Sequence, residues 1–250
     1  MKSTLNFACF VLLMTSFGQA VDLVAAPTQK FPTLAGTVWL TPLHRASVRI
    51  DAGGKVIYID PAKPFDFSKA PLADLILISD IDEDHMDPDA VAALSKPGTE
   101  IISSAAVTKT LTTAWPMDNW ENKTWQGWTI EAVPNYNVKV SYASSKHIHE
   151  NGRANGYVLT YGDQRFYFSG GASAEVPELW ELKKIDVAVV CVYVKTSSCK
   201  GGGLGAFFSA RVFRPRIVIP YNYCGTDKKS FESQFDGTGI EVRELAGYSE

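Results

Sequence analysis

The sequence has no long hydrophobic run, little net charge, and few cysteines and histidines. The formal net charge is −3 over 250 residues, so there is no electrostatic reason to expect a nucleic acid or an anionic membrane as a partner. No apolar run approaches the roughly 20 residues of a membrane-spanning helix, so we expect no integral membrane segment. No linker rich in proline, glycine and serine divides the chain, and 46% of its residues are hydrophobic. These features predict one domain with a large core.

The first twenty residues differ from the rest of the chain. Lys2 supplies a positive charge, residues 7–14 (FACFVLLM) form a short apolar stretch, and residues 17–20 (FGQA) end in small side chains. This order is typical of a secretory signal peptide cleaved after Ala20. We therefore expect residues 1–20 to be removed and residues 21–250 to form a secreted or periplasmic domain. Cys9 lies inside the apolar stretch rather than after the cleavage site, so no lipid anchor is indicated.

Four cysteines are too few for a disulfide framework to be deduced. Removal of Cys9 leaves Cys191, Cys199 and Cys224, which permit one disulfide and leave one thiol over in an oxidising compartment. Cys191 lies in an apolar predicted strand, so we expect it in the core. Cys199 and Cys224 both lie in predicted loops, and the sequence does not decide whether they pair.

Two other patterns carry no chemistry. The glycines of residues 201–205 are not followed by the lysine and hydroxyl residue of a phosphate-binding loop, so we interpret this run as a flexible loop before a short helix. The triplet Asn122-Lys123-Thr124 is a glycosylation sequon and has meaning only in a eukaryotic host.

Short β-prone runs alternate with short helical segments along the whole chain. The predicted strands are 37–40, 47–50, 55–60, 73–79, 100–103, 128–133, 156–161, 164–169, 185–193, 216–220 and 239–243. The predicted helices are 89–94, 105–111, 176–182, 206–211 and 230–235. Both halves of the chain contain strands and short helices. This predicts an α/β fold in which two sheets pack face to face with helices outside, a four-layer sandwich.

The densest group of ionisable side chains directly follows the apolar run Leu75–Ile78. This run is typical of a strand buried on both faces, and the loop after it carries four acids and a histidine: Asp80, Asp82, Glu83, Asp84 and His85. Asp87-Pro88 then predicts a helix start, with Asp as N-cap and Pro at the first helical position. Because crowded carboxylates repel one another, we expect a cation among them, and a divalent metal is the simplest candidate. A solvated acidic turn that only caps a helix is the alternative.

Only three other histidines are present. His147 and His149 lie on one face of the chain if it is extended, which suits metal binding. Polar residues flank them on both sides, so a polar loop remains the alternative. His44 directly precedes a predicted strand and is expected to be structural.

Six segments in a fixed order resemble one family over nearly the whole mature chain. They are 57–61, 73–88, 155–159, 165–170, 185–188 and 220–223. The sequence is similar to the metallo-β-lactamase fold hydrolases, in particular to their lactonase-like branch of metal-dependent hydrolases. The resemblance implies an αββα sandwich and a small-molecule substrate or ligand. That branch includes enzymes acting on lactones, phosphodiesters and other esters or amides, and no residue here selects among them.

The family signature after the buried strand is His-x-His-x-Asp-His, which binds one or two metal ions. Here these positions are Asp80, Asp82, Asp84 and His85, so the last two residues match and both histidines are replaced by aspartate. His149 matches the next histidine of the family pattern.

Two further positions depart from the family pattern. Gly171 stands where the metal-bridging aspartate is expected, and Asn222 stands where the final histidine is expected. Loss of the bridging carboxylate argues against a two-metal centre. The resemblance thus implies these metal ligands: Asp80, Asp82, Asp84, His85 and His149, with Asp82 and Asp84 as catalytic candidates. This oxygen-rich set suits Mn²⁺, Mg²⁺ or Ca²⁺ better than Zn²⁺.

Two hypotheses follow from the altered positions. In the first, the protein is an exported metal-dependent hydrolase with a rearranged, mononuclear or impaired site. In the second, it is a non-catalytic descendant that keeps the fold as a binding or structural module and needs no cofactor. A calcium-dependent interaction protein is a weaker third interpretation, because the twelve-residue calcium loop is absent.

Overall fold

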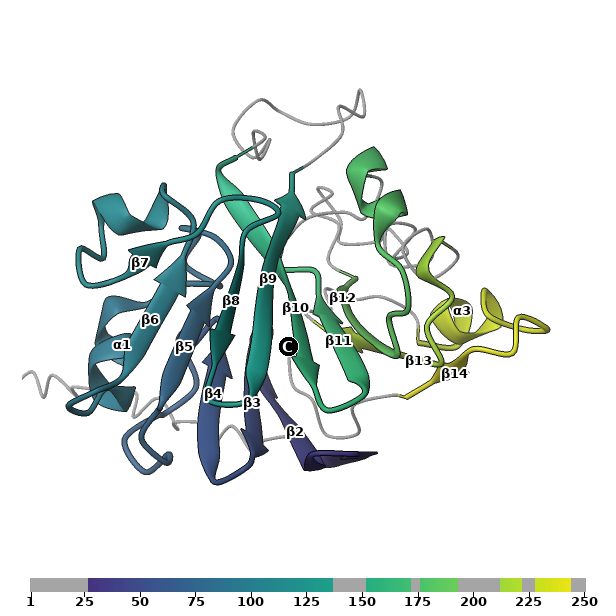
Figure 1. Ribbon diagram of the computed structural model, residues 1–250, viewed down its shortest axis with the longest axis horizontal. Helices are drawn as coiled ribbons and strands as arrows, with labels where there is room; N and C mark the ends of the chain where they lie inside the picture. Colours follow the sequence, from purple (N-terminus) through teal and green to yellow (C-terminus); the bar gives the residue numbers. More distant parts are fainter. Residues whose placement is uncertain (1–26, 137–151, 172–175, 193–211, 222–227, 244–250) are drawn as a thin grey trace, which may run out of the picture.

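The computed structural model describes residues 27–136, 152–171, 176–192, 212–221 and 228–243. Two seven-stranded sheets face each other (Figure 1). The first contains, in spatial order, β1 (Gln29–Thr33), β2 (Gly36–His44), β3 (Ser47–Ala52), β4 (Lys55–Ile59), β5 (Leu75–Ile78), β6 (Glu100–Ser103) and β7 (Trp115–Pro116). The second contains β14 (Glu241–Val242), β13 (Ile217–Tyr221), β12 (Val187–Cys191), β11 (Gln164–Phe168), β10 (Ala154–Tyr161), β9 (Trp128–Asn135) and β8 (Asn122–Trp125).

Each sheet begins with antiparallel strands and ends with parallel ones. In the first sheet β1 to β4 pair antiparallel and β4 to β7 pair parallel. In the second, β8 to β11 pair antiparallel and β11 to β14 pair parallel. The carboxyl ends of parallel strands meet at one edge of a sheet, where α/β folds place their functional loops.

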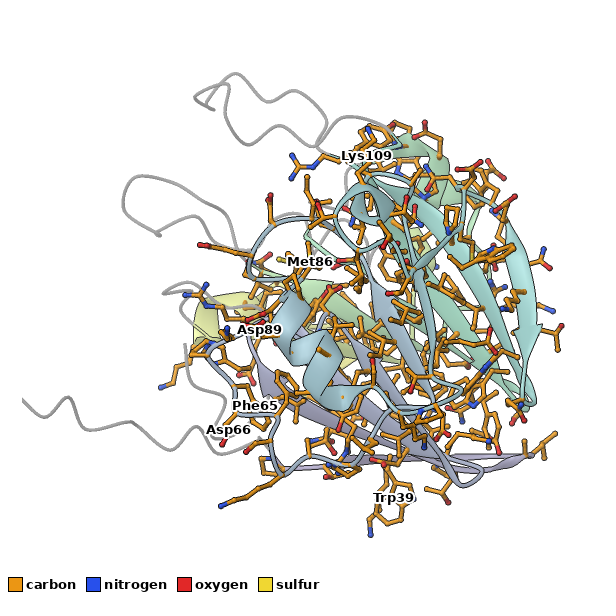
Figure 2. The ribbon with its side chains drawn as sticks, turned by 90° about the vertical axis from the view of Figure 1, so that its left-hand side faces the viewer. Trp39, Phe65, Asp66, Met86, Asp89 and Lys109 are labelled. Carbon is orange, nitrogen blue, oxygen red and sulfur yellow. The ribbon has the colours of Figure 1, made fainter. Side chains whose placement is uncertain are left out.

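Strand β5 is buried on both faces, as its four consecutive apolar residues predict. Leu75 and Leu77 belong to the core between the two sheets. Ile76 and Ile78 point to the other side, into a second apolar cluster that lies under helix α1 (Pro88–Leu94). Figure 2 shows α1 lying against the outer face of the first sheet, with Asp89 at its start. Sheet, core and covering helix therefore follow directly from the apolar pattern.

The predicted α/β four-layer sandwich is confirmed, while two predicted helices are shorter than expected. Residues 105–111 contain only a 3₁₀ turn, Val107–Lys109, in a segment rich in β-branched residues that disfavour a helix. Residues 176–182 contain a 3₁₀ turn, Pro177–Glu181. Helix α3 (Lys228–Ser233) begins two residues before its predicted start, and the helix predicted at 206–211 lies outside the described residues.

Three short or edge strands, β1, β7 and β8, were not predicted. Cys191 is buried in β12 and His44 is buried at the end of β2, which confirms the core location expected for the cysteine. Among the helices that the structure describes, none has the length and apolar character needed to cross a membrane.

Candidate functional site

The acidic loop forms a compact turn between β5 and α1. The backbone N–H groups of His85 and Met86 both donate to the carbonyl of Asp82, at 2.9 Å each. The predicted N-cap is confirmed, because the Asp87 side chain accepts from the backbone N–H of Asp89 at 2.8 Å. The turn folds the chain back, so that His85 lies beside the end of β5.

His85 is held by a buried carboxylate that follows the neighbouring strand β4. Its Nδ1 lies 2.7 Å from Oδ2 of Asp60, which is fully buried. Asp60 also accepts from the backbone N–H of Ser79 at 2.7 Å and from its hydroxyl at 2.6 Å. The ring of His85 is therefore fixed in orientation by two neighbouring strand ends. A histidine held at Nδ1 by a carboxylate presents its other nitrogen for ligation, as metal-binding histidines commonly do.

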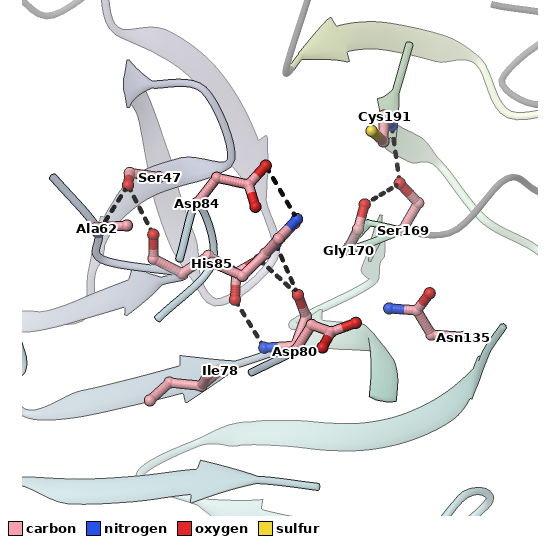
Figure 3. Close-up of polar contacts among 12 residues, drawn as sticks. Ser47, Ala62, Ile78, Asp80, Asp84, His85, Asn135, Ser169, Gly170 and Cys191 are labelled. Carbon is pink, nitrogen blue, oxygen red and sulfur yellow. Dashed lines mark hydrogen bonds and ion pairs between the residues drawn. The ribbon is translucent and has the colours of Figure 1, made fainter. Parts of the chain in front are cut away.

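The other ring nitrogen of His85 faces an acidic residue of the same loop. Nε2 lies 3.7 Å from Oδ2 of Asp84 (Figure 3). Burial by itself lowers the pKa of this imidazole, but the charge and hydrogen bond of Asp60, followed by the charges of Asp84 and Asp80, raise the pKa to about 9. Because a metal ligand must be a neutral imidazole, metal binding at Nε2 competes with a proton.

The two remaining candidate aspartates are paired with an arginine from the second sheet. Arg153, directly before β10, donates through Nε and Nη2 to Oδ1 of Asp80 at 3.2 and 3.0 Å. The same Nη2 lies 2.5 Å from Oδ1 of Asp82. Asp80 is fully buried, and the side chain of Arg153 is 23% exposed. The charges of the two aspartates raise the pKa of Arg153, against the lowering effect of its partial burial. The cation expected among the acids is, in the structure, this guanidinium.

Arg153 is placed where the two sheets touch. Its carbonyl accepts a hydrogen bond of 2.6 Å from the hydroxyl of Ser104, which follows β6. Two residues further on, the backbone N–H of Asn155 donates to the carbonyl of Ser79 at 2.9 Å. The backbone before β10 is thus anchored to the ends of β5 and β6, and these contacts bring the arginine to the acidic loop.

Gly170, just after β11, lies against Ser79 at the end of β5. Gly170 has φ of +62°, a conformation that glycine adopts without strain. A Cβ at this position would overlap Ser79 and the side-chain amide of Asn135, so the two sheets approach too closely here for a side chain. Figure 3 shows Gly170 on the opposite side of the site from Asp84. Gly171, the next residue, offers no carboxylate, as the sequence comparison with the family pattern indicated.

The candidate residues described by the structure divide into two groups. Asp84 and His85 face each other, and Asp80 and Asp82 face Arg153. Ligand atoms of one ion bound at about 2.0–2.2 Å lie roughly 3–4 Å apart, so Asp84 and His85 fit two ligands of a single ion. The described part of the chain contains no group of three or more His, Cys, Asp or Glu side chains suited to a metal ion. The described residues thus offer one candidate ligand pair, Asp84 and His85.

Several predicted residues lie outside the described part of the chain: His147, His149, Cys199, Cys224 and Asn222. Their places in the site stay predictions. Two residues of the site were not predicted from the sequence, Asp60 and Arg153. The signal for Asp60 was its position directly after a strand that neighbours β5. The signal for Arg153 was weaker, a single basic residue just before a strand of the other sheet.

Comparison with known proteins agrees with this architecture. Residues 39–222 match the model of a family described as the beta-lactamase superfamily domain. No curated protein matches the chain. A solved structure from Parabacteroides distasonis ATCC 8503, which carries the provisional name of a metal-dependent hydrolase, is 31% identical. The match covers 90% of this chain and 100% of that one, with a TM-score of 0.79.

Two more distant structures share the fold. Igni18, a metallo hydrolase from the archaeon Ignicoccus hospitalis, is 19% identical with a TM-score of 0.66, over 85% of this chain and 96% of that one. An isothiocyanate hydrolase from Delia radicum gut bacteria is 14% identical with a TM-score of 0.63, over 84% and 97%. At these identities the similarity is one of fold, and it carries no information on substrate.

Proposed function

The chain belongs to the beta-lactamase superfamily, and we propose that it is an exported, hydrolase-like member whose site holds at most one divalent cation. The observation that carries this proposal is the orientation of His85: its Nδ1 contacts Asp60 at 2.7 Å and its Nε2 faces Asp84 at 3.7 Å. This half of the site is built as a ligand pair with a supporting carboxylate. The family pattern assigns His149 as a further ligand.

Each residue of the described site has a distinct role in this proposal. Asp84 and His85 hold the ion, and Asp60 and Ser79 orient the imidazole. Asp82, whose Oδ1 accepts from Arg153, is the candidate general base. When bound, a divalent cation would supply Lewis acidity to a substrate carbonyl or phosphoryl group.

With Asp80 and Asp82 paired to Arg153, the ligands of this proposal are one carboxylate and two imidazoles, a set that suits Zn²⁺ as well as Mn²⁺. The substrate class within the family stays open, because no described side chain distinguishes an ester from an amide or a phosphodiester.

Elemental mass spectrometry of the mature protein, purified without a chelator or a histidine tag, tests this proposal. We expect up to one equivalent of metal, lost in Asp84→Ala and in His85→Ala. Asp66→Ala is a suitable control, because Asp66 is exposed and accepts hydrogen bonds from the backbone and the side chain of Ser68, away from the acidic loop. Equal metal content in all four proteins would contradict the assignment of the ligands.

A second candidate function is supported by the contact between Arg153 and the acidic loop. Arg153 pairs with both Asp80 and Asp82, so part of the acidic charge of the loop is balanced without any ion, as a non-catalytic binding module requires. Absence of bound metal, together with no thermal shift on addition of Zn²⁺, Mn²⁺, Mg²⁺ or Ca²⁺, would favour this candidate.

Export is tested separately from the chemistry. We expect the protein to accumulate outside the cytoplasm with an N-terminus at Val21, determined by sequencing the mature chain. An intact N-terminus in a cytoplasmic fraction would contradict the signal peptide assigned to residues 1–20.

A further inference from the structure

One nitrogen atom lies between the two aspartates that replace histidines of the family pattern. Nη2 of Arg153 is 3.0 Å from Oδ1 of Asp80 and 2.5 Å from Oδ1 of Asp82. Two carboxylates from one loop thus share a single donor atom that comes from the other sheet. The arrangement is that of two ligands around one cation, with a guanidinium as the cation.

We propose that Arg153 is a positioning residue that takes the place of a metal ion between Asp80 and Asp82 and excludes divalent cations from this half of the site. This proposal deepens the proposed function, on which it rests for the location of the site, because it explains why at most one ion binds. It makes no use of the chemistry at Asp84 and His85.

An ion and the guanidinium cannot occupy the space between Asp80 and Asp82 together. A Ca²⁺, Mn²⁺ or Mg²⁺ ion shared by the two Oδ1 atoms would lie roughly 2.0–2.6 Å from each of them. Nη2 of Arg153 already lies at hydrogen-bonding distance from both atoms. An ion held through these oxygens would overlap this nitrogen, so ion and guanidinium exclude each other.

Arg153 also supplies the positive charge that the buried carboxylate of Asp80 requires. Asp80 is fully buried, and a buried carboxylate is costly unless it is paired and hydrogen-bonded. Its Oδ1 accepts from Nε and Nη2 of Arg153 and from the backbone N–H of Ile81 at 2.6 Å. Arginine stays charged at all relevant pH values and suits partly buried ion pairs better than lysine. The loop therefore carries a permanent cation that no chelator can remove.

The backbone of Arg153 is held in place by the first sheet. Its carbonyl accepts from the hydroxyl of Ser104 at 2.6 Å, and Asn155, two residues on, is bonded to Ser79. Contacts on both sides of the arginine thus fix the point from which its side chain reaches the loop. An incoming ion would have to displace the side chain from three hydrogen bonds to carboxylates.

The test replaces the guanidinium and counts bound ions. Mn²⁺ and Ca²⁺ are titrated by calorimetry into the mature wild-type protein, Arg153→Gln and Arg153→Lys. The matched control is Arg165→Gln, because Arg165 also forms an ion pair, with Glu131 at 2.8 Å, and is also about one-quarter exposed, at 27%. It removes the same charge without touching the acidic loop.

We expect Arg153→Gln to bind one equivalent more than the wild-type protein, or to bind at the existing stoichiometry at least tenfold more tightly. Arg153→Lys and Arg165→Gln should match the wild-type protein, since lysine keeps a cation at the loop. The extra site should vanish when Asp80→Asn and Asp82→Asn are added to Arg153→Gln. A folded Arg153→Gln with the wild-type stoichiometry and affinity would overturn the proposal.

The outcomes separate this inference from the proposed function. If the wild-type protein binds no ion and Arg153→Gln binds one, the proposed ligand pair fails and the role of Arg153 stands. If both proteins bind one ion with equal affinity, the proposed function stands and the role of Arg153 fails.

If Arg153→Gln does not fold, refolding in the presence of metal ions tests the proposal instead. Asp80 would then be left buried without its partner, and a divalent cation should replace the lost guanidinium. Refolding of Arg153→Gln in the presence of millimolar Mn²⁺ or Ca²⁺, with no effect on refolding of Arg165→Gln, supports the proposal. Failure of both ions to restore folding, combined with recovery of folding by Asp80→Asn and Asp82→Asn, would show a purely structural ion pair and would overturn it.

Discussion

Asp60 and His85 lie 25 positions apart in the chain, yet Oδ2 of the carboxylate is 2.7 Å from Nδ1 of the imidazole. Both groups are buried, at 0% and 3% exposure. Parallel pairing of β4 with β5 brings them together, because the two residues follow the carboxyl ends of adjacent strands. This contact supports both the fold and the candidate site, and it leads to the first prediction.

Asp60→Ala should lower the free energy of unfolding by about 3–5 kcal/mol, the usual cost of removing one partner from a buried ion pair. The substitution also leaves the backbone N–H of Ser79 without its acceptor. Asp60→Asn should be milder, since an amide oxygen still accepts a hydrogen bond. Urea denaturation measures both effects. Asp66→Ala, in an exposed turn, should leave stability nearly unchanged, and an equal loss in the two alanine variants would contradict this role of Asp60.

Gly170→Ala should be strongly destabilising at the contact between the sheets. A residue with φ of +62° is strained unless it is glycine, and the new Cβ would also overlap Ser79 and Asn135. We expect a loss of about 2–5 kcal/mol. Gly54→Ala is a matched control, because Gly54 has φ of +72° but no neighbour within 4 Å of the added Cβ. It should cost about 1–2 kcal/mol, and equal thermal shifts in the two variants would show that close approach plays no part.

The contribution of Asp74 to stability should depend on pH. Burial raises the pKa of this carboxyl, but the backbone N–H of Val56 and the charges of Lys96 and Lys55 outweigh it and hold the pKa below its ordinary value of 3.8. A depressed pKa means that the stabilisation is present above the unfolded-state value and is lost as the pH falls through the folded-state value.

Asp74→Asn should therefore reduce stability by about 1 kcal/mol at pH 7, and the difference from the wild-type protein should disappear at pH values below the folded-state pKa. Thermal unfolding of the two proteins over a series of pH values measures this. A difference that stays constant down to acid pH would show that the charge of Asp74 is not its cause.

Restoration of the family ligands should create a tighter zinc site. The triple substitution Asp82→His, Gly171→Asp and Asn222→His should raise zinc affinity at least tenfold, measured by competition with a chromogenic chelator. Addition of Arg153→Gln should raise it further, because the guanidinium would no longer occupy the loop. No gain in the triple variant would show that the assignment of these positions to the family pattern is wrong.

The strands and the start of α1 were predictable because their physical causes are local. A continuous apolar run predicted β5. Two β-prone runs on either side of a glycine turn predicted the hairpin of β10 with β11. Asp87 and Pro88 marked the start of α1. The 3₁₀ turn at Val107–Lys109 was overpredicted as a helix, because a short apolar pattern does not reveal how few residues will keep helical hydrogen bonds.

The edge strands β7 and β8 were missed for another reason. β7 has two exposed residues, and β8 has one buried residue among four. Such segments lack a periodic apolar signal, and they become strands because a neighbouring strand offers hydrogen-bonding partners.

By itself, the sequence determined the buried strand, the acidic loop after it and the helix start, and its resemblance to the family predicted the positions at which metal ligands are replaced. Only the tertiary structure shows which cation pairs with Asp80 and Asp82. Arg153 contacts Asp80 across 73 residues of sequence, through two sheets whose contact at Ser79 and Asn155 no local pattern encodes. A pairing of charges depends on distance and burial, and both are properties of the folded chain.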